Sequence, residues 1–243
     1  MSRFFVPPDA VKGNSIIIGG REAHHILDVM RLKISDNVVT FDGTGKEYTG
    51  VIKDISGNSL TVDIIETRVS SEKEASQITL LQALPKKEKM DYIVEKSTEL
   101  GVHSIAPVIT GRTIPDWDEP KKRSQAERWR KIAREAAKQC GRLDIPEVLE
   151  ITNFVKAVKN FTGFDMRLMA VLNNQTIPVK DAISGFKIGK IVIAIGPEGD
   201  FTAAEARSAG AAGFRAISLG PRVLKSDTAG LALLSILSYE FSK

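Results

Sequence analysis

Two segments say most about the fold: Lys190-Ile-Val-Ile-Ala-Ile-Gly-Pro-Glu-Gly199 and Arg215-Ala-Ile-Ser-Leu-Gly-Pro-Arg-Val-Leu-Lys-Ser226. Each begins with an apolar run that stops at a glycine, which is typical of a strand buried on both faces of a parallel sheet. Between them, Thr202-Ala-Ala-Glu205 has the hydroxyl and the glutamate of a capping box and predicts the start of a helix. The pattern predicts two strand–loop–helix units, and both loops should lie at the carboxyl edge of the sheet, where ligands bind.

The two glycine loops differ from loops that hold phosphates. Neither contains the Gly-x-x-x-x-Gly-Lys-Ser/Thr motif or the Gly-x-Gly-x-x-Gly fingerprint. The first loop also carries Glu198 and is followed by Asp200, and carboxylates beside a phosphate would repel it. We therefore expect a neutral or cationic ligand that is held by backbone hydrogen bonds.

The composition is that of an ordinary globular chain. It has 243 residues, of which 42% are hydrophobic and 26% are charged. The single cysteine, Cys140, rules out an internal disulfide and suits a reducing cytosol. The N-terminus lacks a signal peptide pattern and no apolar run could span a bilayer, so we expect a cytoplasmic protein. The net charge of +4 is compatible with nucleic acid but does not require it.

The sequence predicts two domains, residues 1–70 and 71–243. The first is rich in short β-branched and aromatic runs that are separated by turn signals, which predicts a small β-barrel. One predicted helix, 22–32, interrupts this pattern, and its adjacent His24 and His25 do not form a metal-binding pair. The polar residues 68–77 are the predicted linker. Beyond it, predicted strands at 78–81, 104–109 and 167–172 and a predicted helix at 88–100 indicate a parallel α/β domain.

Residues 121–142 form the most basic segment. Such a run is usually a solvated helix face, but an excess of cations also fits an anionic partner.

The last predicted helix, 226–239, is apolar nearly all round and is therefore expected to be buried on several sides, with a second subunit as one packing partner.

These motifs carry a resemblance to a known family. Gly196-Pro-Glu-Gly199, then Leu219-Gly-Pro-Arg-Val-Leu224 and Ser226-Asp-Thr-Ala229, resemble the SPOUT class of methyltransferases. The closest resemblance is to the RsmE family, whose His-x-x-x-Val-Leu-Arg pattern is matched at His25–Arg31, with Met30 in place of the leucine, and which also has the pattern ending at Arg142. This resemblance implies a PUA-like barrel followed by a SPOUT-type α/β-knot domain, in a homodimer. It implies transfer of a methyl group from S-adenosylmethionine to N3 of a uridine in 16S ribosomal RNA, as naked RNA or in the 30S subunit.

The resemblance also implies the roles of individual residues. Arg222 would stabilise charge on the uracil, and Glu198 would accept a proton or hold the amino group of the ligand, two roles between which the sequence does not decide. The implied cofactor-binding residues are Leu172, Asn173, Gly196, Pro197, Gly199, Leu219, Gly220, Leu224 and Ser226. The implied RNA-binding residues are Arg3, His25, Arg31, Arg112 and Arg142.

The sequence departs from the family at two places. Asp200 stands where the family has a second glycine, so a left-handed backbone there would be less comfortable, although aspartate tolerates it better than most residues. Lys225-Ser-Asp227 replaces Arg-Thr-Glu, and a lysine cannot make the bidentate contacts of an arginine. Three other functions stay open: a SPOUT enzyme that acts on another RNA, such as transfer RNA, an RNA-binding module that has lost catalysis, and an unrelated nucleotide-binding enzyme.

Overall fold

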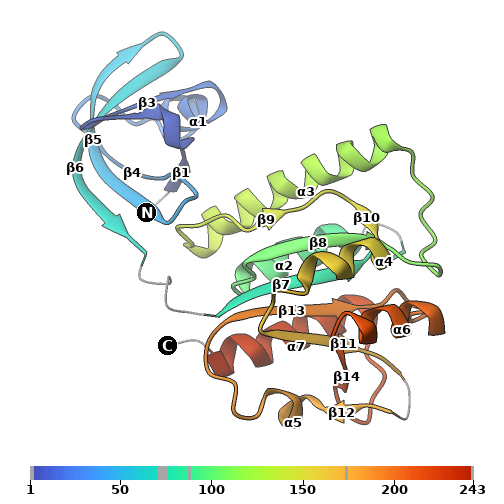
Figure 1. The fold of residues 1–243 in the computed structure, drawn as a ribbon. Helices are drawn as coiled ribbons and strands as arrows, with labels where there is room; N and C mark the ends of the chain where they lie inside the picture. The colour runs from blue at the N-terminus through green and yellow to red at the C-terminus, as the bar shows by residue number, and fades with distance from the viewer. Residues whose placement is uncertain (1–2, 71–75, 87–88, 173–174, 242–243) are drawn as a thin grey trace. The chain divides into compact units, whose positions relative to one another are not determined.

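The computed structural model describes residues 3–70, 76–86, 89–172 and 175–241. These residues form two compact units (Figure 1). The first contains the described residues of Met1–Lys73 together with Arg134–Ile145, and the second contains those of Glu74–Ala133 and Pro146–Lys243. The middle of the predicted linker, residues 71–75, lies outside the described residues. The predicted domain boundaries stay a prediction.

The first unit is a six-stranded sheet around one core. Its order is β1 (Arg3–Phe5), β4 (Asn37–Phe41), β5 (Lys46–Ser56), β6 (Ser59–Val69), β3 (Ser15–Gly19) and β2 (Val11–Lys12). Only the β1–β4 pair is parallel among the pairs of this sheet that the structure describes. Alternate residues of the strands, such as Phe4, Ile16, Ile18, Leu60 and Val62, fill the core, as the two-residue period of a strand requires.

The helix predicted at 22–32 is shorter and less regular than expected. It consists of α1 (Gly20–His24) and one π-helical turn (His25–Val29). Arg31 then takes a left-handed backbone, with φ of 56°, which ends the helix. The apolar spacing alone could not show this end, because Leu32 continues the pattern beyond it.

The end of the long helix α3 (Glu119–Cys140) packs with the first unit. Lys138 binds the carboxylate of Glu22 at 2.9 and 3.1 Å. After the helix, the backbone N–H of Gly45 binds the carbonyl of Leu143 at 3.1 Å. The basic segment therefore contributes some of its cations to ion pairs and not only to a solvated face.

The second unit is built on a parallel sheet. Its strand order is β10 (Thr152–Asn153), β8 (Ser104–Ile109), β7 (Gln77–Ala83), β13 (Lys190–Ile195), β11 (Met166–Ala170), β14 (Arg215–Ser218) and β12 (Ile177–Pro178), with β9 (Glu147–Val148) paired to β8. The central strand β13 is fully buried after Lys190, which explains its unbroken apolar run.

Helices cover both faces of this sheet (Figure 1). α2 (Lys89–Glu99) and α7 (Ser226–Phe241) pack on one face, and α4 (Phe154–Ala157) and α6 (Ala203–Ala211) pack on the other. The remaining short helix, α5 (Val179–Ile183), lies beside β12 and β14. α7 approaches the sheet closely at Gly230, where a Cβ atom would lie 3.1 Å from Gln82 Oε1. No helix in the described part of the chain has the length and apolar character needed to cross a membrane.

Candidate functional site

A cavity of about 240 Å³ opens where β11, β13 and β14 end. Its walls come from the loops after these three strands and from the first turn of α7, and we call it the loop cavity. Because parallel strands end at the same edge of a sheet, segments far apart in sequence meet here. The loop cavity is lined by these residues that the sequence indicated: Leu172, Gly196, Pro197, Glu198, Leu219, Gly220, Arg222, Leu224 and Ser226.

Other predicted residues lie elsewhere. Gly199 belongs to the first loop but does not line the loop cavity. Asn173 lies outside the described residues. The sequence reasoning assigned no ligand contact to Asp200, Ser218, Val223 or Lys225, which also line the cavity. The position of Ser218, immediately before Leu219, was the signal that could have found it.

Ser226 connects the loop cavity to the core of the sheet. Its hydroxyl donates to the carbonyl of Gly196 at 2.6 Å and accepts a hydrogen bond from Gln82 Nε2 at 3.0 Å. Both side chains are buried, so water cannot replace these partners. The contact fixes the start of the first loop against α7, and it was not visible in the sequence, since Gln82 lies in β7.

Asp200 connects the first loop to the loop after β11. One oxygen of its carboxylate accepts from the backbone N–H of Leu172 at 3.0 Å. The backbone of Asp200 is left-handed, with φ of 60°. The sequence left open whether this position takes such a conformation; the structure has it, and aspartate tolerates it better than most residues.

Glu198 lies between the loop cavity and the loop that precedes α2. Both of its carboxylate oxygens accept from the backbone N–H of Lys86, at 3.1 and 3.4 Å. Lys89 Nζ is 3.9 Å from Glu198 Oε1 and 3.3 Å from Asp227 Oδ1. Glu198 therefore has a structural contact in addition to its place at the cavity.

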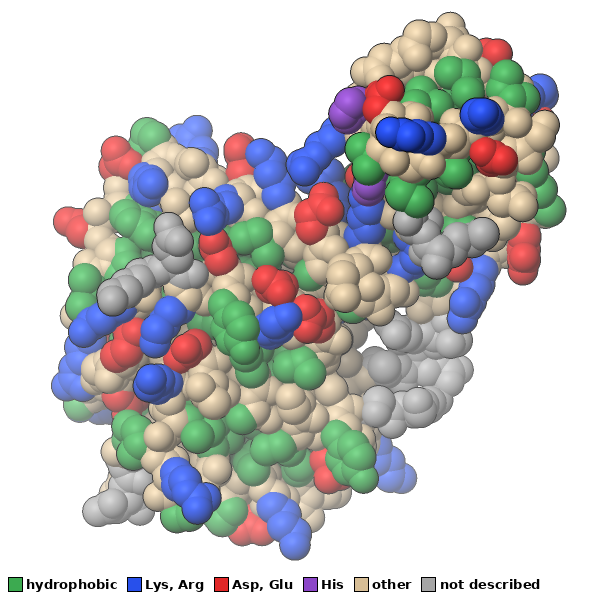
Figure 2. Space-filling view, turned by 180° about the vertical axis from the view of Figure 1, so that it is seen from behind, with side chains coloured by type: hydrophobic (Ala, Val, Ile, Leu, Met, Phe, Trp, Pro, Cys, Tyr) green, Lys and Arg blue, Asp and Glu red, His purple; other side chains and the backbone are tan. Residues whose placement is uncertain are grey.

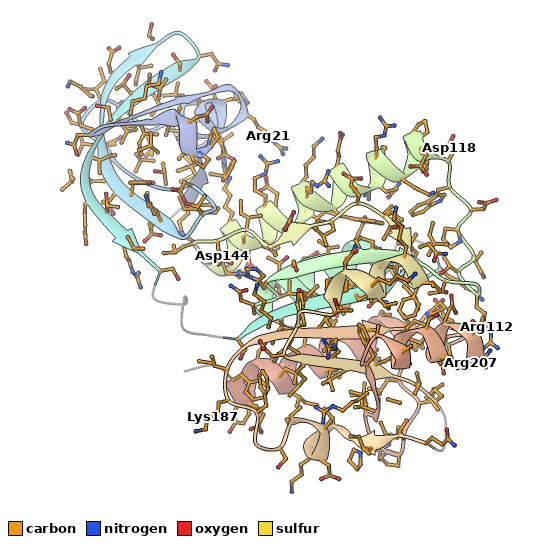
Figure 3. All side chains as sticks on the ribbon, viewed as in Figure 1. Arg21, Arg112, Asp118, Asp144, Lys187 and Arg207 are labelled. Carbon is orange, nitrogen blue, oxygen red and sulfur yellow. The ribbon has the colours of Figure 1, made fainter. Side chains whose placement is uncertain are left out.

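Arg112 supports the first loop from outside. Its guanidinium donates to the carbonyl of Gly199 at 2.6 Å, and Gly111 N–H donates to Glu205 Oε1 at 2.7 Å. Glu205 also completes the predicted capping box with Thr202, which is confirmed. Figure 3 shows Arg112 beside the α6 end of the second unit. RNA binding by Arg112 stays a prediction.

Arg222 and Lys225 bring positive charge to the loop cavity. Within the described part of the chain, neither side chain makes a hydrogen bond or an ion pair. Leu172 and Val223 form an apolar rim and are 63% and 73% exposed. Exposed apolar side chains at the mouth of a cavity are typical of a surface that a ligand or partner covers.

Two predicted RNA-binding arginines of the first unit already have protein partners. Arg3 Nε binds Glu47 at 2.8 Å, and its guanidinium lies 4.9 Å from the centre of the Phe41 ring. Arg142 Nε binds Asp144 at 3.2 Å, and its side chain is only 10% exposed. Figure 3 labels Asp144 in the segment that follows α3. A role in RNA binding stays a prediction for both arginines.

His25 is the first residue of the π-helical turn, and Arg31 lies two residues after the end of this turn. The His25 ring packs edge-on against Phe4, with centroids 5.4 Å apart. Arg31 is exposed, and its side chain has no ion pair with the residues that the structure describes. RNA binding by His25 and Arg31 stays a prediction.

Comparison with known proteins agrees with this geometry. A model described as an RNA methyltransferase domain matches residues 72–238, and one described as an RNA methyltransferase PUA domain matches residues 18–65. The ribosomal RNA small subunit methyltransferase E of Bacillus subtilis is 29% identical over 99% of this chain and 97% of its own length. The crystal structure of the enzyme of that name from Neisseria gonorrhoeae, bound to S-adenosyl methionine, superposes with a TM-score of 0.87. It is 30% identical and covers 99% of this chain and 98% of its own.

The chain belongs to the ribosomal RNA small subunit methyltransferase E family. This is the RsmE family that the sequence motifs indicated, and the expected fold class, a PUA-like unit followed by a SPOUT-type α/β domain, is confirmed. A putative methyltransferase from Legionella pneumophila in complex with the bound cofactor SAM is also similar, with a TM-score of 0.86 and 29% identity over 98% of this chain and 96% of its own.

Proposed function

We propose that this protein transfers the methyl group of S-adenosylmethionine to N3 of a uridine in 16S ribosomal RNA. The observation that carries the proposal is the loop cavity, in which three loops and Arg222 meet, in a chain that matches a small-subunit methyltransferase over nearly its whole length. A cytoplasmic location follows from the proposed substrate.

The residues that line the loop cavity suit the cofactor in polarity and in charge. The backbone at Gly196, Leu219 and Gly220 would bind an adenine edge, and Leu172 and Leu224 would supply apolar walls. The Gly220 N–H donates to Ser218 Oγ at 3.2 Å in this structure and would exchange that partner for the ligand. Glu198 and Asp200 add negative charge, which suits a sulfonium and an amino group better than a phosphate. The bound cofactor would supply a methyl group on a positively charged sulfur.

The residues of the chain would then act on the uracil. N3 of uridine carries a proton and becomes a good nucleophile only when that proton leaves. Negative charge then develops on the neighbouring carbonyl oxygens, where the Arg222 guanidinium would stabilise it. Of the two carboxylates at the cavity, Asp200 accepts from Leu172 N–H, and Glu198 would accept the proton or hold the amino group of the cofactor, while its bonds to Lys86 N–H hold it in place.

We also propose that the protein acts as a homodimer through α7 and the rim of the loop cavity. Leu231, Ala232 and Ile236 of α7 are only half-buried within the chain, and Tyr239 is 82% exposed. Covering these side chains would remove apolar surface from water. Sedimentation of a stable monomer at micromolar concentration would contradict the dimer.

Ligand-dependent stability tests the cofactor assignment. A ligand at about a hundredfold its dissociation constant stabilises the folded protein by roughly 2.7 kcal/mol. We expect S-adenosylmethionine to raise the melting temperature and ATP to leave it unchanged. A clear shift with ATP and none with S-adenosylmethionine would overturn the assignment.

A further inference from the structure

A second cavity, of about 520 Å³, lies in the second unit, and none of its lining residues lines the loop cavity. Its walls come from the loop after β7, from α2, from the loop before α3 and from α3 itself. Trp117 and Trp129, the two tryptophans of the chain, both line it, and we call it the tryptophan cavity. Nothing in the proposed methyl transfer uses these residues.

The two tryptophans have different roles in this cavity. Trp129 is 1% exposed, and its indole N–H donates to Asp91 Oδ1 at 3.1 Å, so it is part of the core. Trp117 is only half-buried, and its ring is tilted by 41° from that of Trp129, with centroids 6.2 Å apart. The indole N–H of Trp117 has no hydrogen-bond partner in the described ranges. Trp117 therefore offers an aromatic face and a donor to a ligand.

The charge around the tryptophan cavity favours an anion. Lys86, Lys121 and Arg128 line it, against one acidic residue, Asp91. Both oxygens of Asp91 are already used, since Oδ1 accepts from Trp129 and Oδ2 accepts from Arg128 Nε at 3.0 Å. Asp91 thus holds Arg128 in place and offers little repulsion of its own. An aromatic face beside several cations is the arrangement that binds single-stranded nucleic acid.

The tryptophan cavity adjoins the loop cavity through one pair of residues. The side chain of Lys86 lines the tryptophan cavity, and its backbone N–H binds Glu198, which lines the loop cavity. This contact places part of the lining of one cavity against part of the lining of the other. Figure 2 shows basic and acidic side chains interspersed over the second unit. RNA binding is therefore inferred from the residues that line the tryptophan cavity and not from the overall charge of this surface.

We propose that the tryptophan cavity binds a second base of the substrate RNA, close in sequence to the methylated uridine. The base stacks on Trp117, and Lys121 and Arg128 contact the adjoining phosphates. This inference rests on the proposed function, and it assigns part of the RNA recognition to the catalytic domain itself.

Intrinsic fluorescence gives a direct test, because both tryptophans line this cavity. The probe is a single-stranded oligouridylate of ten nucleotides, added to the full-length protein with S-adenosylmethionine present. We expect the RNA to quench the tryptophan emission. Trp117→Ala should weaken RNA binding by between about fivefold and about a hundredfold, and Trp117→Phe should keep affinity within about threefold, since the aromatic face remains.

Matched lysines test the phosphate contact. Lys121→Gln should lower the slope of log affinity against log salt by about one. Lys131→Gln, an exposed lysine farther along α3, should leave the slope unchanged. If both variants lowered the salt slope equally, the effect would come from the overall charge of the protein and not from a phosphate contact at Lys121. That result would overturn the assignment of the contact to this cavity.

Three results would overturn the inference. The first is RNA binding by the parent protein without quenching, and the second is unchanged RNA affinity in a folded Trp117→Ala protein. The third is a Trp117→Ala protein that sediments as a smaller species than the parent protein, because the cavity would then be a subunit interface. Failure of the proposed function would differ, because the parent protein itself would then neither bind S-adenosylmethionine nor methylate RNA.

Discussion

Asp200 accepts a hydrogen bond from the backbone N–H of Leu172 at 3.0 Å, which joins two loops of the cavity across 28 residues of sequence. Asp200→Gly should relax the left-handed backbone but lose this bond, and a hydrogen bond to a charged group contributes about 1.5–3 kcal/mol. We expect weaker S-adenosylmethionine binding, measured by calorimetry. Asp200→Ala should also unfold at a lower temperature than Asp200→Gly, because its Cβ strains φ of 60°. Equal melting temperatures of the two variants would contradict this account.

Ser226→Ala should destabilise the protein without adding any bulk. The change leaves the buried carbonyl of Gly196 without the hydroxyl that binds it at 2.6 Å, and an unsatisfied buried group costs about 1–3 kcal/mol. We expect a lower melting temperature and weaker cofactor binding. Ser226→Thr, the residue of the family pattern, should restore both, and a Thr variant as weak as Ala would show that the hydroxyl is not what matters.

Glu198→Gln separates the two roles of this side chain. Glutamine keeps an oxygen for the Lys86 N–H but cannot accept the proton from N3. If Glu198 is the base, single-turnover methylation should slow by about a hundredfold or more, while cofactor affinity changes little. A variant with normal turnover would leave Glu198 as a structural contact only.

Arg142→Ala and Asp144→Ala form a matched pair. Each removes the ion pair between Arg142 and Asp144, so both should lose thermal stability. If Arg142 contacts RNA, only Arg142→Ala should weaken RNA binding and lower its salt dependence by about one unit of slope. Equal RNA affinity of the two variants would reduce Arg142 to a structural residue.

Much of the second unit could be predicted from the sequence for a physical reason. A parallel strand that is buried on both faces must be apolar throughout, so Lys190–Ile195 and Ser104–Ile109 were predicted with the bounds that the structure has. The capping box at Thr202 and the start of α7 at Ser226 could also be predicted, because each is marked by residues close together in the sequence.

The contacts between the loops could not be predicted in this way. Glu198 meets Lys86 across 112 residues, and Gln82 meets Ser226 across 144. Such pairs depend on the order of the strands in the sheet. The apolar periodicity of a single segment predicts a strand or a helix but does not predict that order. The early end of the helix before Arg31 has a similar cause, because it follows from a backbone angle and not from the apolar pattern.

The most direct test of the account is nucleoside mass spectrometry of 16S ribosomal RNA after reaction with the protein and S-adenosylmethionine. The parent protein should produce N3-methyluridine from naked RNA or from 30S subunits. Arg222→Ala should bind the cofactor normally but form this product about a hundredfold to a thousandfold more slowly, the usual effect of losing one such donor. A different methylated nucleoside, or an unchanged rate in the folded Arg222→Ala protein, would contradict the account.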